Sequence, residues 1–364
     1  MLESKIIHSF QRGSGSVTMA GKFRQICLKC SLLGLFMLFL QPVFSQADWN
    51  DLDAQLKVKQ KQLGTDFVVM VWKGDTIVHK KEMGGFNSKT QAAIGGSSKW
   101  LTAALVMVMV DEGKISLDDK ISTYLPVFAK YGKNYITLRL CLTHMTGIED
   151  EGKKLFQRTI FSSLEDKVNS YAAREIRANP GEDVWFGNMG CDIAARVLEV
   201  VSKKKFDVLI KQKLFNQLSM RRTTFSTLDA SLPDPSNGAM TTPDDFMQFL
   251  GMMLNKGKYK GKQVLSEASI NELMKVGTKT ELIKYAPKAL HGYNFAPGSV
   301  VFEENNGKAT VLASPGLSGT WPMVDYCHGY AYLVMTKTPV TDEKPEEYLQ
   351  LKKLVDQQAP STCQ

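Results

Sequence analysis

The sequence has few of the residues that build metal or redox centres. Its 364 residues include 6 Cys and 5 His. Apart from one C-x-x-C pair near the N-terminus, none of these stand together at the spacing of zinc ligands. It also has no glycine-rich phosphate loop. We therefore expect neither a metal ion nor a cofactor.

Outside the N-terminus, basic residues only slightly outnumber acidic residues. The formal net charge is +8, but residues 1–45 hold five basic residues against one acid. The rest of the chain has 40 basic and 36 acidic residues, a net charge of +4. An excess this small and this scattered does not predict a nucleic-acid surface.

No apolar run reaches the roughly 20 residues that a transmembrane helix needs. The run at residues 31–40 follows three basic residues between positions 22 and 29 and is ended by Pro42. This is the pattern of a secretory signal peptide. We expect a signal at residues 1–45, with Met19 as an alternative start, and a secreted or periplasmic protein without a stable membrane span after cleavage. An uncleaved anchor is the alternative.

Cysteine usage leaves the disulfide pattern open. A C-x-x-C pair, Cys27 and Cys30, lies in the predicted signal and would be removed with it. The four that remain are Cys141, Cys191, Cys327 and Cys363. Of these, Cys141 and Cys191 lie in apolar segments and are expected to be small buried residues rather than disulfide partners.

The order of the patterns predicts a sheet built from both ends of the chain. Residues 67–72 and 76–79 form two apolar strands around Gly74-Asp75, which predicts a hairpin. Further strands are predicted at residues 300–302, 310–312, 321–324 and 330–336. Helices are expected at residues 51–63 and 346–357, next to these strands.

The middle of the chain is mainly helical in pattern. Residues 101–110 are almost wholly apolar, which predicts a central core helix ended by Gly113. Residues 191–203 repeat their apolar positions at helical spacing. The predicted fold class is α/β (α+β): an α/β lobe at about residues 46–114 and 255–364, with an inserted helical lobe at about 115–254. We expect residues 46–364 to form one domain.

The chain contains several long stretches of characteristic sequence, among them GSSKWLTAALVMVMVDEGKISLDDKISTYLP at 96–126, ITLRLCLTHMTGI at 136–148 and PGLSGTWPMVD at 315–325. These stretches resemble the β-lactamase-related serine hydrolases, the family of class C β-lactamases, DD-peptidases and related esterases. The resemblance runs from about residue 50 to 340 in the family's order. It implies a β-lactamase/transpeptidase-like fold, an antiparallel sheet with flanking helices, and an active site in the cleft beside the helical lobe.

The first family motif, S-x-x-K, has lost its serine. In this family the lysine amine reaches the hydroxyl of a serine three residues earlier on the same helix face and helps to deprotonate it. Lys99 stands at the lysine position, and the position three residues before it is Gly96. The nucleophile is therefore predicted to be missing.

Two neighbouring serines are weighed as substitutes. Ser97 and Ser98 lie about 200° and 100° around an ideal helix from Lys99, so neither shares its face. We expect both to cap the helix N-terminus. An irregular first turn could instead rotate Ser97 toward the cleft, which makes Ser97 the fallback nucleophile.

The other two motifs are also altered. At the Y-x-N position the sequence has Phe186-Gly187-Asn188, which keeps the amide but lacks the proton-carrying hydroxyl. At the K-T-G or H-x-G position it has Ser314-Pro315-Gly316, without the cation. The resemblance implies binding roles for Asn188, for Gly316 through close backbone approach, and for the backbone N–H of Leu317 as a second oxyanion donor.

The altered motifs thus predict a secreted pseudoenzyme, and the resemblance implies that it keeps a cleft able to bind cell-wall peptides or similar acyl compounds. Loss of a serine nucleophile in a related mechanism costs on the order of 10⁶ in turnover. Two alternatives are kept: a weakly active esterase, DD-peptidase or β-lactamase that uses Ser97 with Lys99, and an envelope scaffold or interaction protein. Its oligomeric state is not predicted.

Overall fold

The computed structural model describes residues 47–149, 161–226, 232–316, 319–340 and 345–363. The predicted signal peptide with Met19, Cys27 and Cys30 lies outside the described residues, as does Leu317. No described helix is both long and apolar enough to cross a membrane.

A seven-stranded sheet, antiparallel throughout, forms the centre of residues 48–364. The strand order is β2-β1-β13-β12-β11-β10-β9, so the first strand pairs with the last. The prediction that the two ends of the chain build one sheet is confirmed. The strands are β1 (Phe67–Lys73), β2 (Thr76–Met83), β9 (Asn294–Ala296), β10 (Ser299–Asn305), β11 (Lys308–Ala313), β12 (Trp321–Asp325) and β13 (Tyr330–Thr336).

The first hairpin forms around the predicted two-residue turn at Gly74 and Asp75. Gly74 and Asp75 both adopt positive φ, 57° and 63°, as the central residues of a two-residue hairpin turn do. Alternate residues of β1 then face opposite sides of the sheet. Val68 and Met70 join one apolar core, whereas Phe67 and Val69 join a second one.

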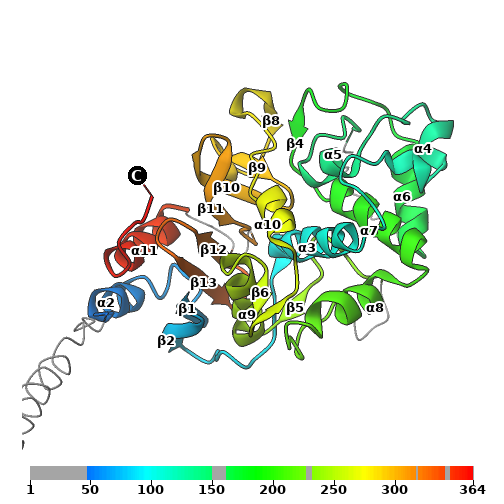
Figure 1. The fold of residues 1–364 in the computed structure, drawn as a ribbon. Helices are drawn as coiled ribbons and strands as arrows, with labels where there is room; N and C mark the ends of the chain where they lie inside the picture. The colour runs from blue at the N-terminus through cyan, green and yellow to red at the C-terminus, as the bar shows by residue number, and fades with distance from the viewer. Residues whose placement is uncertain (1–46, 150–160, 227–231, 317–318, 341–344, 364) are drawn as a thin grey trace, which may run out of the picture. The chain divides into compact units, whose positions relative to one another are not determined.

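Helices cover both faces of the sheet (Figure 1). Helices α2 (Asn50–Val58) and α11 (Pro345–Gln357) pack together over the second core. Helix α9 (Pro243–Leu254) packs on β1, β12 and β13 on the other side. The expected extension of the first helix to residue 63 is wrong. It ends at Val58, and Gly64 and Thr65, both at positive φ, turn the chain into β1.

Helix α3 (Ser98–Asp111) is the predicted central helix. Twelve of its 14 residues are buried, and Gly113, at a φ of 66°, follows its end. A short 3₁₀ turn, η1 (Gly95–Ser97), precedes it. The N-terminal end of α3 carries the first family motif, so the burial of α3 fixes that motif in place.

The middle of the chain is mainly helical, as predicted. It contains η2 (Ile121–Thr123), α4 (Val127–Lys130), α5 (Leu138–Leu142), α6 (Leu164–Ala172), α7 (Met189–Ser202), α8 (Phe206–Ile210) and η3 (Lys211–Phe215). Small two-stranded sheets join β3 (Ala92–Ala93) to β5 (Met240–Thr241), β4 (Val184–Trp185) to β8 (Ile283–Tyr285), and β6 (Lys258–Tyr259) to β7 (Lys262–Gln263). The remaining elements are α10 (Glu267–Leu273), η4 (Thr280–Leu282) and η5 (Lys288–Leu290). The predicted lobe boundaries stay a prediction, but α9, inside the range 115–254, lies on the sheet.

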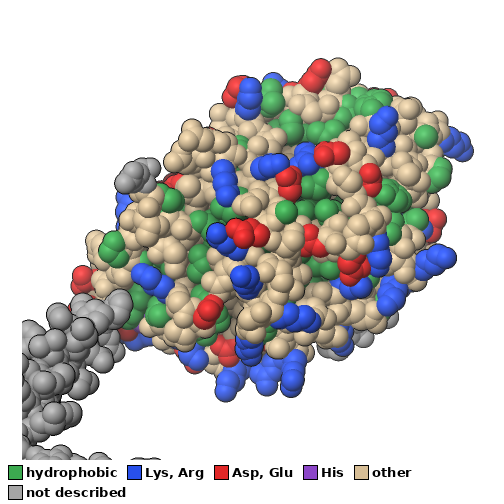
Figure 2. Space-filling model, in the orientation of Figure 1, with side chains coloured by type: hydrophobic (Ala, Val, Ile, Leu, Met, Phe, Trp, Pro, Cys, Tyr) green, Lys and Arg blue, Asp and Glu red, His purple; other side chains and the backbone are tan. Residues whose placement is uncertain are grey.

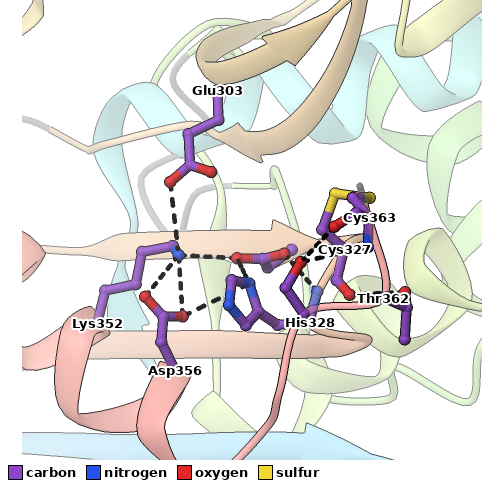
Figure 3. Close-up of a disulfide and its surroundings, with 9 residues drawn as sticks. Glu303, Cys327, His328, Lys352, Asp356, Thr362 and Cys363 are labelled. Carbon is purple, nitrogen blue, oxygen red and sulfur yellow. Dashed lines mark hydrogen bonds and ion pairs between the residues drawn. A yellow bond between two sulfur atoms is a disulfide. The ribbon is translucent and has the colours of Figure 1, made fainter.

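One disulfide, Cys327–Cys363, ties the turn after β12 to the tail after α11 (Figure 3). The Thr362 backbone N–H donates to the Cys327 carbonyl at 2.7 Å and strengthens this link. The pairing left open by the sequence is thereby answered. Cys141 and Cys191 are free and buried, as expected.

Beside the disulfide lies a compact ion-pair network. Ligand atoms of Asp325, His328 and Asp356 lie within 4.8 Å of one another, a grouping that could suit a metal ion. The Lys352 ammonium, however, lies 2.7 Å from Asp325 and 3.0 Å from Asp356 (Figure 3). Burial alone would lower the pKa of Lys352, but its bonds to Asp325 and Asp356 outweigh this and raise the pKa. The two carboxylates thus already share one ammonium group as their counter-charge.

The surface carries both signs of charge. On the face shown in Figure 2, positive and negative side chains are interspersed over most of the area. This agrees with the small net charge of the chain beyond residue 45.

Candidate functional site

Gly96 lies where the nucleophile would stand, and the protein's own backbone closes over it. The Gly96 N–H points to the Gly316 carbonyl at 3.4 Å. A Cβ added at Gly96 would lie 3.2 Å from the Pro315 carbonyl oxygen, closer than most real contacts allow. The segment 314–316 therefore packs tightly against Gly96, and a side chain at position 96 would require it to shift by a few tenths of an ångström.

Ser97 helps to hold this segment in place. It is fully buried, and its hydroxyl donates to the Ser314 carbonyl at 2.5 Å. The first turn is irregular, as the fallback hypothesis required, but it directs the hydroxyl to Ser314 and no bond joins Ser97 to Lys99 among the described residues.

The expected capping by the two serines is wrong. No side-chain cap bond forms at the start of α3. The hydroxyl of Ser97 is committed to Ser314, and that of Ser98 accepts from the Ala239 N–H at 3.0 Å. Both groups are used in tertiary contacts, which a pattern of local spacing does not reveal.

Lys99 is buried beside oxygen atoms that carry no full charge. Its amine lies 3.4 Å from the Ser236 carbonyl and 3.5 Å from Oδ1 of Asn237. It also lies 5.3 Å from the centre of the Phe186 ring. Burial lowers the pKa of Lys99, and the carboxylates of Asp234 and Asp192 oppose this only in part. A less basic amine suits proton transfer, but among the described residues no hydroxyl is hydrogen-bonded to it.

The loop that carries Ser236 and Asn237 was not assigned to the site from the sequence. Its Gly238 packs so closely on Asp234 that an added Cβ would meet the Asp234 carbonyl at 2.8 Å. The Ser236 hydroxyl donates to the Asn188 carbonyl at 2.9 Å, which ties this loop to the second motif. The sequence stretch SNG was an available signal, since it falls within the family resemblance.

Phe186, the first residue of the second motif, lies next to Lys99, as the resemblance implied. Asn188 is exposed at the start of α7, and its side chain makes no cap bond there. The Phe186 ring packs 4.6 Å from the ring of His144. This part of the site thus presents a ring and an amide, and no phenolic hydroxyl.

His144, which lies in the stretch 136–148 that resembles the family, also belongs to the site. It is buried at a φ of 62°, and its Nδ1 faces the Gly187 N–H at 3.5 Å. Burial, and then the charge of Lys99, lower the pKa of His144 to about 3. The imidazole is therefore neutral at physiological pH and does not replace the cation lost from the third motif.

Ser314 and Gly316 follow β11 and lie against the start of α3. Gly316 does permit close backbone approach, since an added Cβ would meet the Ile94 carbonyl at 2.5 Å. The approaching backbone is the protein's own, from the turn before α3. The predicted oxyanion donor Leu317 lies outside the described residues.

These residues line a very small, partly open pocket. Its volume is about 10 Å³, close to the least that holds one water molecule. Its walls include Gly96, Lys99, His144, Phe186 and Ser314. The structure thus brings together all three altered motifs, but Ser97 is turned away and Asn188 lies at the edge.

Comparison with known proteins agrees with this architecture. The β-lactamase family model matches residues 57–356. A candidate β-lactamase from Bacteroides dorei has a solved structure with a TM-score of 0.76 and 22% identity, over 85% of this chain and 98% of that one. The penicillin-binding protein homologue of Caulobacter crescentus gives a TM-score of 0.70 and 14% identity over 85% and 98%.

One similar protein is named for an enzymatic activity. The D-alanyl-D-alanine-carboxypeptidase/endopeptidase AmpH of Escherichia coli is 22% identical over 197 residues, 46% of this chain and 50% of that protein. The matched part thus spans about half the length of the curated relative. The family model covers most of the chain, and the order of sheet, central helix and motifs agrees with it. The chain belongs to the β-lactamase family, whose penicillin-binding and β-lactamase-like members are serine hydrolases.

Proposed function

We propose that this protein is an exported, non-hydrolytic member of the β-lactamase family that acts by binding. The observation that carries the proposal is the closure over Gly96. No side-chain nucleophile stands there, a Cβ at this position would lie 3.2 Å from the Pro315 carbonyl oxygen, and the Gly96 N–H faces the Gly316 carbonyl. Acyl transfer needs a nucleophile and a free oxyanion donor in the same place.

The ligand class is drawn from the family. Cell-wall peptides and similar acyl compounds are the ligands we propose, because AmpH is named for activity on D-alanyl-D-alanine groups. The cavity of about 10 Å³ is far too small for a peptide. Such a ligand would bind along the rim near Asn188, or segment 314–316 would move away from α3.

Export is supported by the disulfide. Disulfides persist in oxidising compartments and are rare in the cytosol, and Cys327–Cys363 is well placed to form one. Together with the signal pattern at residues 1–45, this supports a periplasmic or secreted location.

Turnover of ester and β-lactam substrates tests the proposal. The unmodified protein is expected to hydrolyse neither class above the buffer rate, and Gly96→Ser alone should gain little, because Phe186 and Ser314 still lack the proton relay and the cation. Gly96→Ser with Phe186→Tyr and Ser314→Lys should gain measurable turnover, provided segment 314–316 shifts by a few tenths of an ångström. Normal turnover by the unmodified protein would refute the proposal and favour the hydrolase that uses Ser97.

The scaffold alternative needs a separate measurement. Binding of a D-alanyl-D-alanine peptide, followed by calorimetry, should be weakened by Asn188→Ala and unaffected by Lys258→Ala, which alters an exposed lysine on β6. No peptide binding, together with envelope partners that both variants retain, would support the scaffold instead.

A further inference from the structure

A short segment after α7 holds the entire positive excess of the chain beyond residue 45. Residues 203–222 contain seven basic residues and one acid, Asp207. Residues 46–364 contain 40 basic and 36 acidic residues, so without this segment they contain 33 and 35, a net charge of −2. The seven basic residues are Lys203, Lys204, Lys205, Lys211, Lys213, Arg221 and Arg222. The small net charge of the chain therefore conceals one strongly basic segment.

The fold exposes these basic side chains along one surface. Helix α8 and η3 follow each other directly, and their apolar side chains apart from Val208 are buried, which leaves the polar ones facing solvent. Lys203, at a φ of 57°, turns the chain after α7, so that three consecutive exposed lysines precede α8. Six of the seven basic residues are exposed, and Lys213 is partly buried. Lys and Arg side chains gather along the lower edge of Figure 2, over α8, and we call residues 203–222 the basic stripe.

Little of this charge is neutralised within the protein. In the part of the chain that the structure describes, Lys213 alone of the seven has a carboxylate within 4.0 Å, that of Glu112 at 2.6 Å. The Lys204 ammonium donates to the side-chain oxygen of Gln212 at 2.6 Å, and this oxygen carries no full charge. The basic stripe therefore presents a row of positive charge to solvent.

The surroundings of the basic stripe add a further lysine and exposed apolar side chains. Lys262 on β7 donates to the side chain of Gln217, which lies within the stripe. On α8 itself, the side chain of Val208 is 43% exposed. Beyond the end of the stripe, the Thr224 N–H donates to the carbonyl of Met240, whose side chain is 37% exposed. Positive charge and exposed apolar surface thus lie together on this side of the protein.

This combination fits the surface of an anionic lipid bilayer. Five of the seven basic residues are lysines, flexible point charges that suit an extended array of phosphates, whereas arginine is favoured where one anion is held in a fixed two-pronged geometry. Lysines around an exposed apolar side chain are typical of a segment that lies on a bilayer. The centre of a protein–protein interface is, by contrast, depleted of lysine. A lipid surface is therefore the partner that the stripe fits best.

We propose that the basic stripe docks the protein on a membrane surface that contains anionic lipid. The lysine ammonium groups lie against the lipid phosphates, and Val208 enters the headgroup layer. Because the attraction is electrostatic, salt weakens it. The stripe contains none of the residues of the three altered motifs, so the docking does not depend on whether the cleft binds or hydrolyses a ligand.

Sedimentation with lipid vesicles tests the docking. At an ionic strength of about 0.1 M the unmodified protein should pellet with vesicles of phosphatidylcholine and phosphatidylglycerol and not with phosphatidylcholine alone, and the difference should vanish at about 1 M, where the screening length is much shorter. The readout is the difference between the two kinds of vesicle, so any N-terminal apolar run that inserts into both does not contribute to it.

Two double variants separate the basic stripe from the rest of the surface. Lys205→Gln with Lys211→Gln should lower the partition into anionic vesicles roughly 25-fold, about fivefold for each charge removed. Lys57→Gln with Lys353→Gln, a matched loss of two exposed lysines on α2 and α11, should leave it nearly unchanged.

Heparin, a soluble polyanion, provides the remaining comparison. Val208→Ser should weaken binding to anionic vesicles and leave binding to heparin unchanged, because only the bilayer offers an apolar layer. Equal pelleting with neutral and anionic vesicles, equal losses in the two double variants, or binding to heparin without binding to anionic vesicles would each overturn the proposal.

Discussion

Ser97 is the residue whose role differs most from that of a cap or a nucleophile. Its hydroxyl is buried and bonded to the Ser314 carbonyl. Ser97→Ala would leave that carbonyl without this donor, which costs about 1–3 kcal/mol. We expect this loss in urea unfolding, against a change within about 0.5 kcal/mol for Ser361→Ala on the exposed tail. No loss of stability would show that Ser97 does not hold segment 314–316.

His144 makes stability depend on pH. Its folded pKa is about 3, against an ordinary value of 6.5, so the unfolded chain binds the proton more readily. The stability is present in full above pH 6.5 and is lost as the pH falls toward 3. Between pH 7 and 5 the loss from this group is about 2 kcal/mol.

The variant His144→Asn isolates this contribution, because asparagine tolerates the positive φ at this position. Urea unfolding at pH 7 and pH 5 should show a smaller loss for the variant than for the unmodified protein, by about 2 kcal/mol. Equal losses in the two proteins would mean that His144 is not held neutral.

For single residues, the sequence predicted which motif positions lack the family's functional groups, but it did not predict the contacts that the residues of the site make in the fold. The glycine at position 96 and the ring at position 186 follow from motif spacing alone. Ser97 contacts Ser314 and Lys99 contacts Ser236, and both contacts join residues far apart in the chain. The burial of His144 likewise depends on distant residues, so no local spacing encodes any of these features.

Among the elements, α3 determines where the site lies. Leu105 in its middle is fully buried. Leu105→Ala should destabilise the protein by about 2–5 kcal/mol through lost contacts and a cavity. Val58→Ala, at a side chain that is 73% exposed at the end of α2, should change stability by no more than about 0.5 kcal/mol. Similar effects of the two variants in urea unfolding would contradict the central place of α3.

Helices and strands with a regular apolar pattern were predicted at the right places in the chain, whereas the residues at which they end were predicted less closely. The hairpin of β1 and β2, the helix α3 and the strands from β10 to β13 follow from apolar patterns and from Gly74-Asp75. Helix α2 ends five residues before the predicted end because the chain must reverse into β1. Helix α9 lies on the sheet through contacts with β1, β12 and β13, and its own amphipathic pattern does not say which lobe it covers.

For the whole molecule, the disulfide closes the C-terminal part of the fold. Cys327 and Cys363 are 36 residues apart in the sequence. Replacing both by alanine should lower the free energy of unfolding by about 2–4 kcal/mol, mainly by freeing the unfolded chain. Adding a reductant should lower the stability of the unmodified protein to a similar extent and leave the double variant unchanged. A reductant that affects both proteins equally would contradict this role.

The most direct test of the central claim is the intact mass of the unmodified protein after incubation with excess penicillin or fluorophosphonate. The closure over Gly96 and the engagement of Ser97 by Ser314 predict an unchanged mass. A stoichiometric adduct that disappears in Ser97→Ala would contradict the claim, because it would show that a serine in this cleft still attacks an acyl or phosphonyl centre.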